Sequence, residues 1–179
     1  MSTQQLLLIA FAALLIFWML GAYNRVVALR NAIATAWAQV EEPLQRRAQA
    51  IAPLADGLRE ALPDEQAAIE ALLAAQLELQ RAAAAMRTAC AQAPRAAALA
   101  AAEAALAAAL ARLLALLDQH PAAADAQALQ LAALQHASRR LAFARQLFND
   151  AVQAYNDAVQ QFPTRLLTRL FGFAAAGSL

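Results

Sequence analysis

This chain of 179 residues contains no lysine, one cysteine and four glycines. All 14 of its basic residues are therefore arginines, and with 13 acids they give a formal charge of +1. Because the charges of both signs are spread along the chain, no field exists that would attract nucleic acid, and we expect no nucleic-acid partner. The single cysteine, Cys90, cannot form an intramolecular disulfide, so the sequence does not imply an oxidising compartment.

The residues that carry most enzymatic chemistry are also scarce. His120 and His136 are the only histidines, and no Cys/His cluster, glycine-rich phosphate loop or Gly-x-Ser-x-Gly element occurs. Carboxylate pairs such as Glu41-Glu42 and Asp64-Glu65 are explained better by solvation or helix capping than by acid–base catalysis. The sequence therefore predicts a protein that is not an enzyme and that uses no cofactor or metal.

What the sequence does contain is one long apolar run, from Leu6 to Tyr23. Its length is close to the ~20 residues with which a helix crosses ~30 Å of hydrocarbon, and amphipathic rings such as Trp18 favour the membrane interface. A cleaved signal peptide is the alternative, but residues 1–5 carry no Arg or Lys and no A-x-A site ends the run. We predict an uncleaved anchor in which Leu6, Trp18 and Tyr23 contact the lipid bilayer.

Charge near the ends of this run indicates its orientation. Arg25 and Arg30 follow it closely, whereas no charge precedes it. Positively charged flanks remain in the cytoplasm. We therefore expect a single-pass protein with its N-terminus outside the cell and the rest of the chain inside.

After the anchor, the composition predicts helices only. Ala, Leu, Gln, Glu and Arg rank high in helix propensity and leave little material for strands. The prolines mark the joints, and they predict helices at about Thr3–Ala61, Asp64–Ala91, Arg95–Gln119 and Ala122–Phe162. Short joints favour antiparallel neighbours. We predict an all-α fold in which the transmembrane helix continues into an antiparallel up-down bundle of long helices.

The predicted organisation has four parts: a short N-terminal tail (1–5), the transmembrane helix (6–23), a helical bundle (24–162) and an amphipathic C-terminal tail (163–179). In an up-down bundle the fourth helix ends beside the membrane span. This return brings the following residues toward the lipid: Arg165, Leu166, Leu167, Arg169, Leu170, Phe171 and Phe173. The tail then either lies on the bilayer as an interfacial helix or caps the end of the bundle.

Two coiled-coil-like seams predict which faces of the first and last long helices point inward. When the seams are extended, Arg47 falls on the first and Arg145 on the second, at positions where apolar side chains are expected. A buried guanidinium must be paired and hydrogen-bonded. The candidate partners nearby are Glu41, Glu42, Asn149, Asp150 and Asn156. These groups either fix the register of the helices or line a polar pocket for a small ligand.

A series of short motifs runs through the last helix: Ala144-Arg145, Phe148-Asn149-Asp150-Ala151-Val152, Tyr155-Asn156 and Phe162-Pro163. The first helix carries Tyr23-Asn24-Arg25, Ala36-Trp37 and Leu44-Gln45-Arg46-Arg47. In order and spacing these elements closely resemble the signature of the LemA family. Ala48-Gln49 stands where that family usually has Tyr-Asp, so the chain is identified as a divergent member. The resemblance implies a single-pass protein of the bacterial inner membrane with a bundle of long helices, and it supplies no reaction.

Two functions of different class remain. The first is a non-enzymatic scaffold or interaction module at the membrane, with protein partners of unknown identity and the option of self-association. The second is a membrane-tethered sensor that binds a small anionic ligand between helices near Arg47 and Arg145. Asp150 discriminates between them, because the sensor needs guanidinium groups that Asp150 and the asparagines leave unpaired. The residues of this polar network or partner site are Arg46, Arg47, Arg145, Asn149, Asp150, Tyr155 and Asn156.

Overall fold

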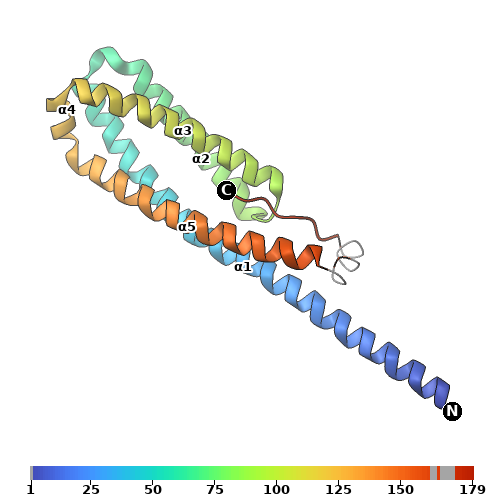
Figure 1. Ribbon diagram of the computed structural model, residues 1–179. Helices are drawn as coiled ribbons and strands as arrows, with labels where there is room; N and C mark the ends of the chain where they lie inside the picture. The colour runs from blue at the N-terminus through green and yellow to red at the C-terminus, as the bar shows by residue number, and fades with distance from the viewer. Residues whose placement is uncertain (1, 162–164, 166–171) are drawn as a thin grey trace.

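The computed structural model describes residues 2–161, 165 and 172–179, and its long helices lie side by side (Figure 1). In chain order the helices are α1 (Thr3–Ala61), a short 3-10 helix η1 (Pro63–Glu65), α2 (Gln66–Thr88), α3 (Ala93–Gln119), α4 (Pro121–Ala126) and α5 (Ala128–Gln160). Within these described ranges the chain forms no strand. The prediction of an all-α fold is confirmed.

The first helix, α1, begins with a capping box and has the predicted bounds. The hydroxyl of Ser2 accepts a hydrogen bond from the Gln5 N–H, and the Gln5 side chain accepts one from the Ser2 N–H at 3.0 Å. This reciprocal pair satisfies two donors that would otherwise lack partners at the start of a helix. Pro43 and Pro53 each remove one hydrogen bond of the helical ladder, and the helix continues through both.

The two halves of α1 lie in different surroundings. No residue of α1 before Val26 is buried, and the bundle begins at that point, so the N-terminal half projects beyond the other helices (Figure 1). Among the described residues, α1 and α3 are the two helices long and apolar enough to cross a membrane. The apolar stretch of α3 contributes Leu99 and Leu106 to the core, whereas that of α1 has no buried residue.

The bundle is assembled around the second half of α1, which packs against both α5 and α2, while α3 packs against α2. Successive long helices run in opposite directions (Figure 1), and ion pairs connect α1 to both of its neighbours. Glu41 pairs with Arg87 of α2, and Glu42 pairs with Arg140 of α5 at 3.3 Å. α1, whose N-terminal half is the apolar stretch, is therefore the central helix of the bundle.

The predicted seams form the core. On α1 these residues are all buried: Ile33, Trp37, Val40, Leu44, Ile51, Leu54 and Leu58. On α5 the buried residues of the seam are Leu141, Phe148, Val152, Tyr155 and Val159, and Phe162 lies outside the described residues. The rings of Trp37 and Phe148 meet edge to face with their centroids 6.2 Å apart, a geometry that aromatic pairs prefer.

The ends of α2 and α3 differ from the prediction. α2 begins at Gln66 after the 3-10 turn, and it stops at Thr88 instead of Ala91 because the chain must turn before Pro94, near the start of α3. Arg95 reaches back across this turn and donates a hydrogen bond to the Ala85 carbonyl at 2.6 Å. It thereby satisfies a carbonyl in the last turn of α2.

The helix predicted over Ala122–Phe162 is instead two helices, α4 and α5, separated at Gln127. Gln127 is buried against α1, where it occupies the space beside Gly57. A Cβ on Gly57 would lie 2.2 Å from the Gln127 side-chain nitrogen, so a larger residue at this position would displace the end of the Gln127 side chain. The break coincides with this tertiary contact, for which the local helix pattern gives no signal.

We expect Phe148→Ala to lower the free energy of unfolding by about 3–5 kcal/mol, because the ring is fully buried and its loss leaves a cavity against Trp37. Phe143→Ala, on the same helix, is the matched control. Its ring is 64% exposed, so we expect a change within about 0.5 kcal/mol. Urea unfolding in mild detergent, followed by the fluorescence of Trp37 in a Trp18→Phe background, measures both changes. Equal losses for the two variants would contradict the assigned core.

Candidate functional site

The buried ion pair between α1 and α3 contains Arg47. Its side chain is 8% exposed and that of Glu103 is 13% exposed. Arg47 Nη2 donates to both carboxylate oxygens of Glu103, at 2.5 and 2.8 Å. Arg47 Nε is buried with no hydrogen-bond partner among the described residues. The charge of the guanidinium is thus neutralised by a partner from a different helix.

The partners predicted for Arg47 were wrong. The partner is Glu103, and the helix that carries it, α3, consists largely of alanine and leucine and shows little contrast between its faces. A signal nevertheless exists in the sequence. Glu103 follows Leu99 by four positions and precedes Leu106 by three, so it lies on the same face as the leucines that α3 buries. A lone acid on the apolar stripe of one helix is a natural partner for a lone arginine on the stripe of another.

The other charged residues of the predicted network are not brought together. Arg46 points to the surface and pairs with Glu42 one turn earlier, with a side chain that is 55% exposed. Arg145 is half-buried beside a small cavity between α1, α3 and α5, which Glu103 and Leu179 also line. Asp150 is exposed. None of the ion pairs formed by the described residues includes Arg145 or Asp150, so Asp150 satisfies neither arginine.

The two asparagines of α5 have a different role: they hold residues 172–179, here called the tail, against the bundle. Asn156 donates to the Ala176 carbonyl at 3.0 Å and accepts from the Ala176 N–H at 2.8 Å. Asn149 forms the same two bonds with Leu179, both at 2.8 Å. Tyr155 adds a fifth bond, from its hydroxyl to the Ala174 carbonyl at 3.0 Å. We call these three side chains and the tail the clasp.

The spacing of the asparagines matches that of the tail. Asn149 and Asn156 are seven positions apart, which on an α-helix is about 10.5 Å. Ala176 and Leu179 are three positions apart, which in an extended chain is about 10 Å. Both side-chain amides can therefore pair with the tail at the same time, and the tail runs antiparallel to α5.

The opposite wall of the clasp is the start of α3. A Cβ on Gly177 would lie 2.7 Å from the Ala93 Cα and 2.9 Å from the Ala96 Cβ, so the tail approaches α3 as closely as a glycine allows. The tail lies between α5 and α3 and closes the space between them (Figure 1). Residues 173–179 of the predicted amphipathic tail are thus extended and packed on the bundle, whereas Arg165 is exposed and helical, with its N–H bonded to the Gln161 carbonyl at 2.9 Å. The predicted lipid-facing residues Leu166, Leu167, Arg169, Leu170 and Phe171 lie outside the described residues.

The tail also contacts the region where the apolar stretch of α1 ends. The rings of Phe173 and Tyr23 pack with their centroids 5.9 Å apart. Burial raises the pKa of the Tyr155 phenol, and the nearby charge of Arg30 offsets part of this rise. The Tyr155 phenol of the clasp is therefore uncharged at neutral pH.

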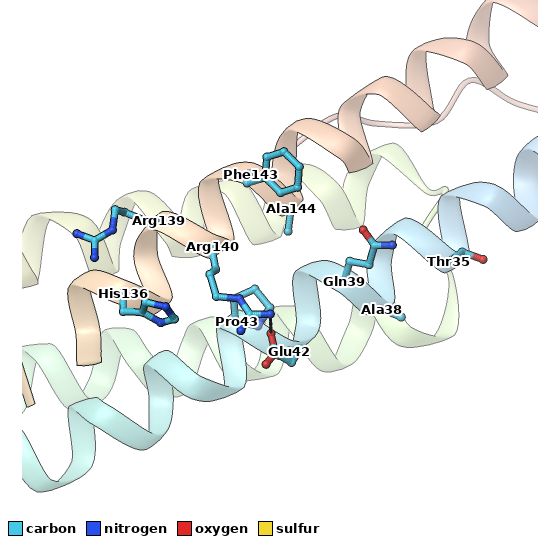
Figure 2. A pocket seen from close by; sticks show the side chains of 10 residues that line it. All are labelled: Thr35, Ala38, Gln39, Glu42, Pro43, His136, Arg139, Arg140, Phe143 and Ala144. Atoms are coloured by element: carbon cyan, nitrogen blue, oxygen red, sulfur yellow. Dashed lines mark ion pairs between the residues drawn. The ribbon is translucent and has the colours of Figure 1, made fainter. Parts of the chain in front are cut away.

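A second concave surface, shown in Figure 2, lies on the outer side of α1 and α5. This groove of about 820 Å³ is lined by Thr35, Ala38, Gln39, Glu42, Pro43, His136, Arg139, Arg140, Phe143 and Ala144. Arg140 reaches across it from α5 to Glu42, and the ring of Phe143 is 64% exposed. Within the described ranges, His, Cys, Asp and Glu form no group of three that could hold a metal ion.

The LemA family model matches residues 36–178, a range that contains Trp37, Arg47, Glu103, both clasp asparagines and nearly all of the tail. This chain belongs to the LemA family. A comparison with curated proteins found no match. In this LemA protein the matched range begins after the apolar stretch of α1, so it comprises the bundle together with the clasp.

We expect Arg47→Ala to cost about 3–5 kcal/mol of unfolding free energy, because it leaves the Glu103 carboxylate buried without a partner. Arg46→Ala, one position earlier, is the control and should cost at most about 1 kcal/mol, since its ion pair with Glu42 is exposed. Urea titration of both variants measures the difference. Recovery of stability in the double variant Arg47→Met/Glu103→Leu would show that the loss came from the unpaired charge.

Tyr155 makes the stability of the clasp depend on pH at the alkaline end. Because its folded pKa lies above the unfolded value of ~10, the unfolding free energy is unaffected by this group below that pH and falls as the pH rises through the folded pKa. Tyr155→Phe removes the bond to Ala174, so we expect a loss of about 0.5–1.5 kcal/mol at neutral pH and no further contribution above pH ~10. Urea titrations between pH 7 and 11 test this, with Tyr23→Phe as the control. An identical alkaline loss in wild type and Tyr155→Phe would contradict the assignment.

Proposed function

We propose that this LemA protein is a non-enzymatic interaction module held at the membrane by a single span, with its bundle in the cytoplasm. The observation that carries the proposal is the continuity of α1, which has no buried residue along its apolar stretch and then becomes the central helix of the bundle without a break. Leu6 is 54% exposed and Trp18 is 41% exposed. A contiguous apolar surface of this kind is unfavourable in water and favourable in lipid.

A continuous helix gives the bundle a fixed position relative to the bilayer. The exposed stretch and the packed seam belong to one element, so the bundle cannot rotate freely about a linker, as it would behind a flexible tether. Tyr23, Arg25 and Arg30 mark the level of the membrane surface, since tyrosine favours either membrane interface and arginine favours the cytoplasmic one. The proposed module therefore presents the same faces at the same height in every copy.

The contacts of the polar network count against the alternative, a sensor of a small anion. An anion at Arg47 would have to compete with Glu103, whose two oxygens already accept hydrogen bonds from the guanidinium. The amide groups of Asn149 and Asn156 bind the tail. Arg47 and both asparagines are thus used within the chain. Arg145 forms no ion pair with the described residues, but the cavity that it lines measures about 10 Å³, which leaves room for about one water molecule. These contacts favour the interaction module.

We expect Leu14→Arg in the exposed stretch of α1 to weaken membrane attachment, because an arginine near the centre of a span costs about 2.5–3.5 kcal/mol. Leu77→Arg is the matched control, since Leu77 is similarly exposed but lies on α2 of the bundle. Alkaline carbonate extraction of cell membranes compares the two. Retention of Leu77→Arg with release of Leu14→Arg supports the span, and release of the wild-type chain itself would overturn it.

The interaction role is tested by affinity purification after cross-linking in intact cells. Quantitative mass spectrometry compares proteins bound to the full-length chain with those bound to Leu14→Arg. Enrichment of the same proteins in replicate experiments, with loss in the variant, supports the module. A bound metabolite lost on Arg47→Ala, without any enriched protein, would instead support the sensor.

A further inference from the structure

The clasp recognises the tail as a peptide ligand is recognised. The hydrogen bonds described between the bundle and the tail all go to backbone atoms of the tail: the Ala174 carbonyl, and the N–H and carbonyl of both Ala176 and Leu179. An asparagine amide carries its oxygen and one of its two N–H bonds on the same side, so it can accept from the N–H and donate to the carbonyl of one residue in an extended chain. Asn149 and Asn156 therefore pair with an extended chain as a neighbouring β-strand would, and such main-chain bonds supply affinity without reading side chains.

Selectivity comes from the residues between and beside these bonds. Ala176 is buried, so its position takes a small residue, and Gly177 lies so close to Ala93 and Ala96 that any side chain would clash. Ser178 is exposed, and its position takes any residue. Leu179 lines the small cavity between α1, α3 and α5, next to Glu103. The groove thus selects the order small, Gly, any residue, Leu.

We propose that Asn149 and Asn156 form a peptide-binding groove and that residues 173–179 of a second copy of this chain occupy it in trans, by exchange with the chain's own tail. The fit of this sequence to the groove is seen directly in the cis arrangement. Identical tails exchanged between copies make the same contacts, and such swapping is a low-cost route to association. The proposed interaction module then uses this groove to associate with a second copy of the chain.

The position of the groove favours a second copy as the donor. The tail enters beside Tyr23, at the end of the apolar stretch of α1. This step rests on the proposed membrane span, because copies anchored in one bilayer with one orientation hold their tails and grooves at the same height. Ala174, Ala175 and Ser178 of the tail are exposed, so its release uncovers chiefly the buried Ala176 and the half-buried Phe173 and Leu179.

The first experiment tests the groove in detergent, where it does not depend on the membrane span. The full-length Gly177→Val chain keeps the groove but excludes its own tail, and the probe is a fluorescent peptide with the sequence of residues 173–179. We expect this chain to bind the peptide at least tenfold more tightly than wild type, in which the cis tail competes at high effective concentration. Ser178→Val, at the exposed neighbouring position, is the matched control and should bind like wild type.

Two further measurements keep this test decisive. A peptide carrying Gly177→Val should not bind to any of the chains, and because this control alters only the peptide it does not depend on folding of a variant. Adding Asn149→Ala and Asn156→Ala to the Gly177→Val chain should reduce binding at least tenfold, with circular dichroism and cooperative urea unfolding to verify the fold. Equal binding of the two peptides would overturn the groove.

The second experiment tests exchange between copies by complementation in the membrane. One tagged full-length chain carries Gly177→Val and supplies only a groove, and the other carries Asn149→Ala and Asn156→Ala and supplies only a tail. We expect co-purification of the mixed pair at least fivefold above that of either variant with itself, and its loss when the tail donor also carries Gly177→Val. Peptide binding without association of the mixed pair would overturn the second copy as the occupant. Failure of the membrane span alone would leave the peptide result unchanged.

Discussion

Burial of one apolar stripe on α1 is the constraint on which the rest of this structure depends. That stripe, from Ile33 to Leu58, packs against α5 on one side and α2 on the other, and α3 is added through its contact with α2. An α-helix presents such a stripe in a fixed direction. The same helix carries the exposed apolar stretch, so the placement of the bundle relative to that stretch follows from α1 alone.

The ion pair of Arg47 and Glu103 then sets the position of α3. Two buried charges are tolerated only when they meet, because each costs several kcal/mol when it is desolvated without a partner. Sliding α3 by one helical turn, about 5.4 Å, would separate them and leave both unpaired. Contacts between alanines and leucines discriminate weakly between such registers, since one turn of α3 resembles the next. We therefore expect the pair to favour one register of α3, the helix that has the fewest distinctive side chains.

The sequence predicts the helical elements well where their signals are local. Prolines and the four-three spacing of apolar residues predict the bounds of α1 and the buried faces of α1 and α5, because these depend on helix geometry alone. The break at Gln127 has no proline or glycine to mark it, and it lies where Gln127 packs beside Gly57 of a distant helix. The pairing with Glu103 is missed because it joins helices far apart in the chain. The contacts of the clasp are not predicted for a third reason. The tail is extended and has no helical pattern of apolar residues from which its pairing with Asn149 and Asn156 could be inferred.

The chemistry of the clasp explains why both of its main residues are asparagines. Aspartate would accept a hydrogen bond from the tail N–H but could not donate one to the tail carbonyl, and its charge would be half-buried beside uncharged groups. Asparagine satisfies both backbone groups of Ala176 and of Leu179, and two such pairs fix the direction and the register of the tail. The alanines at the start of α3 complete the arrangement, because larger side chains in place of Ala93 and Ala96 would fill the space that the tail occupies. A groove for an extended chain therefore follows from placing small residues on α3 opposite amides on α5.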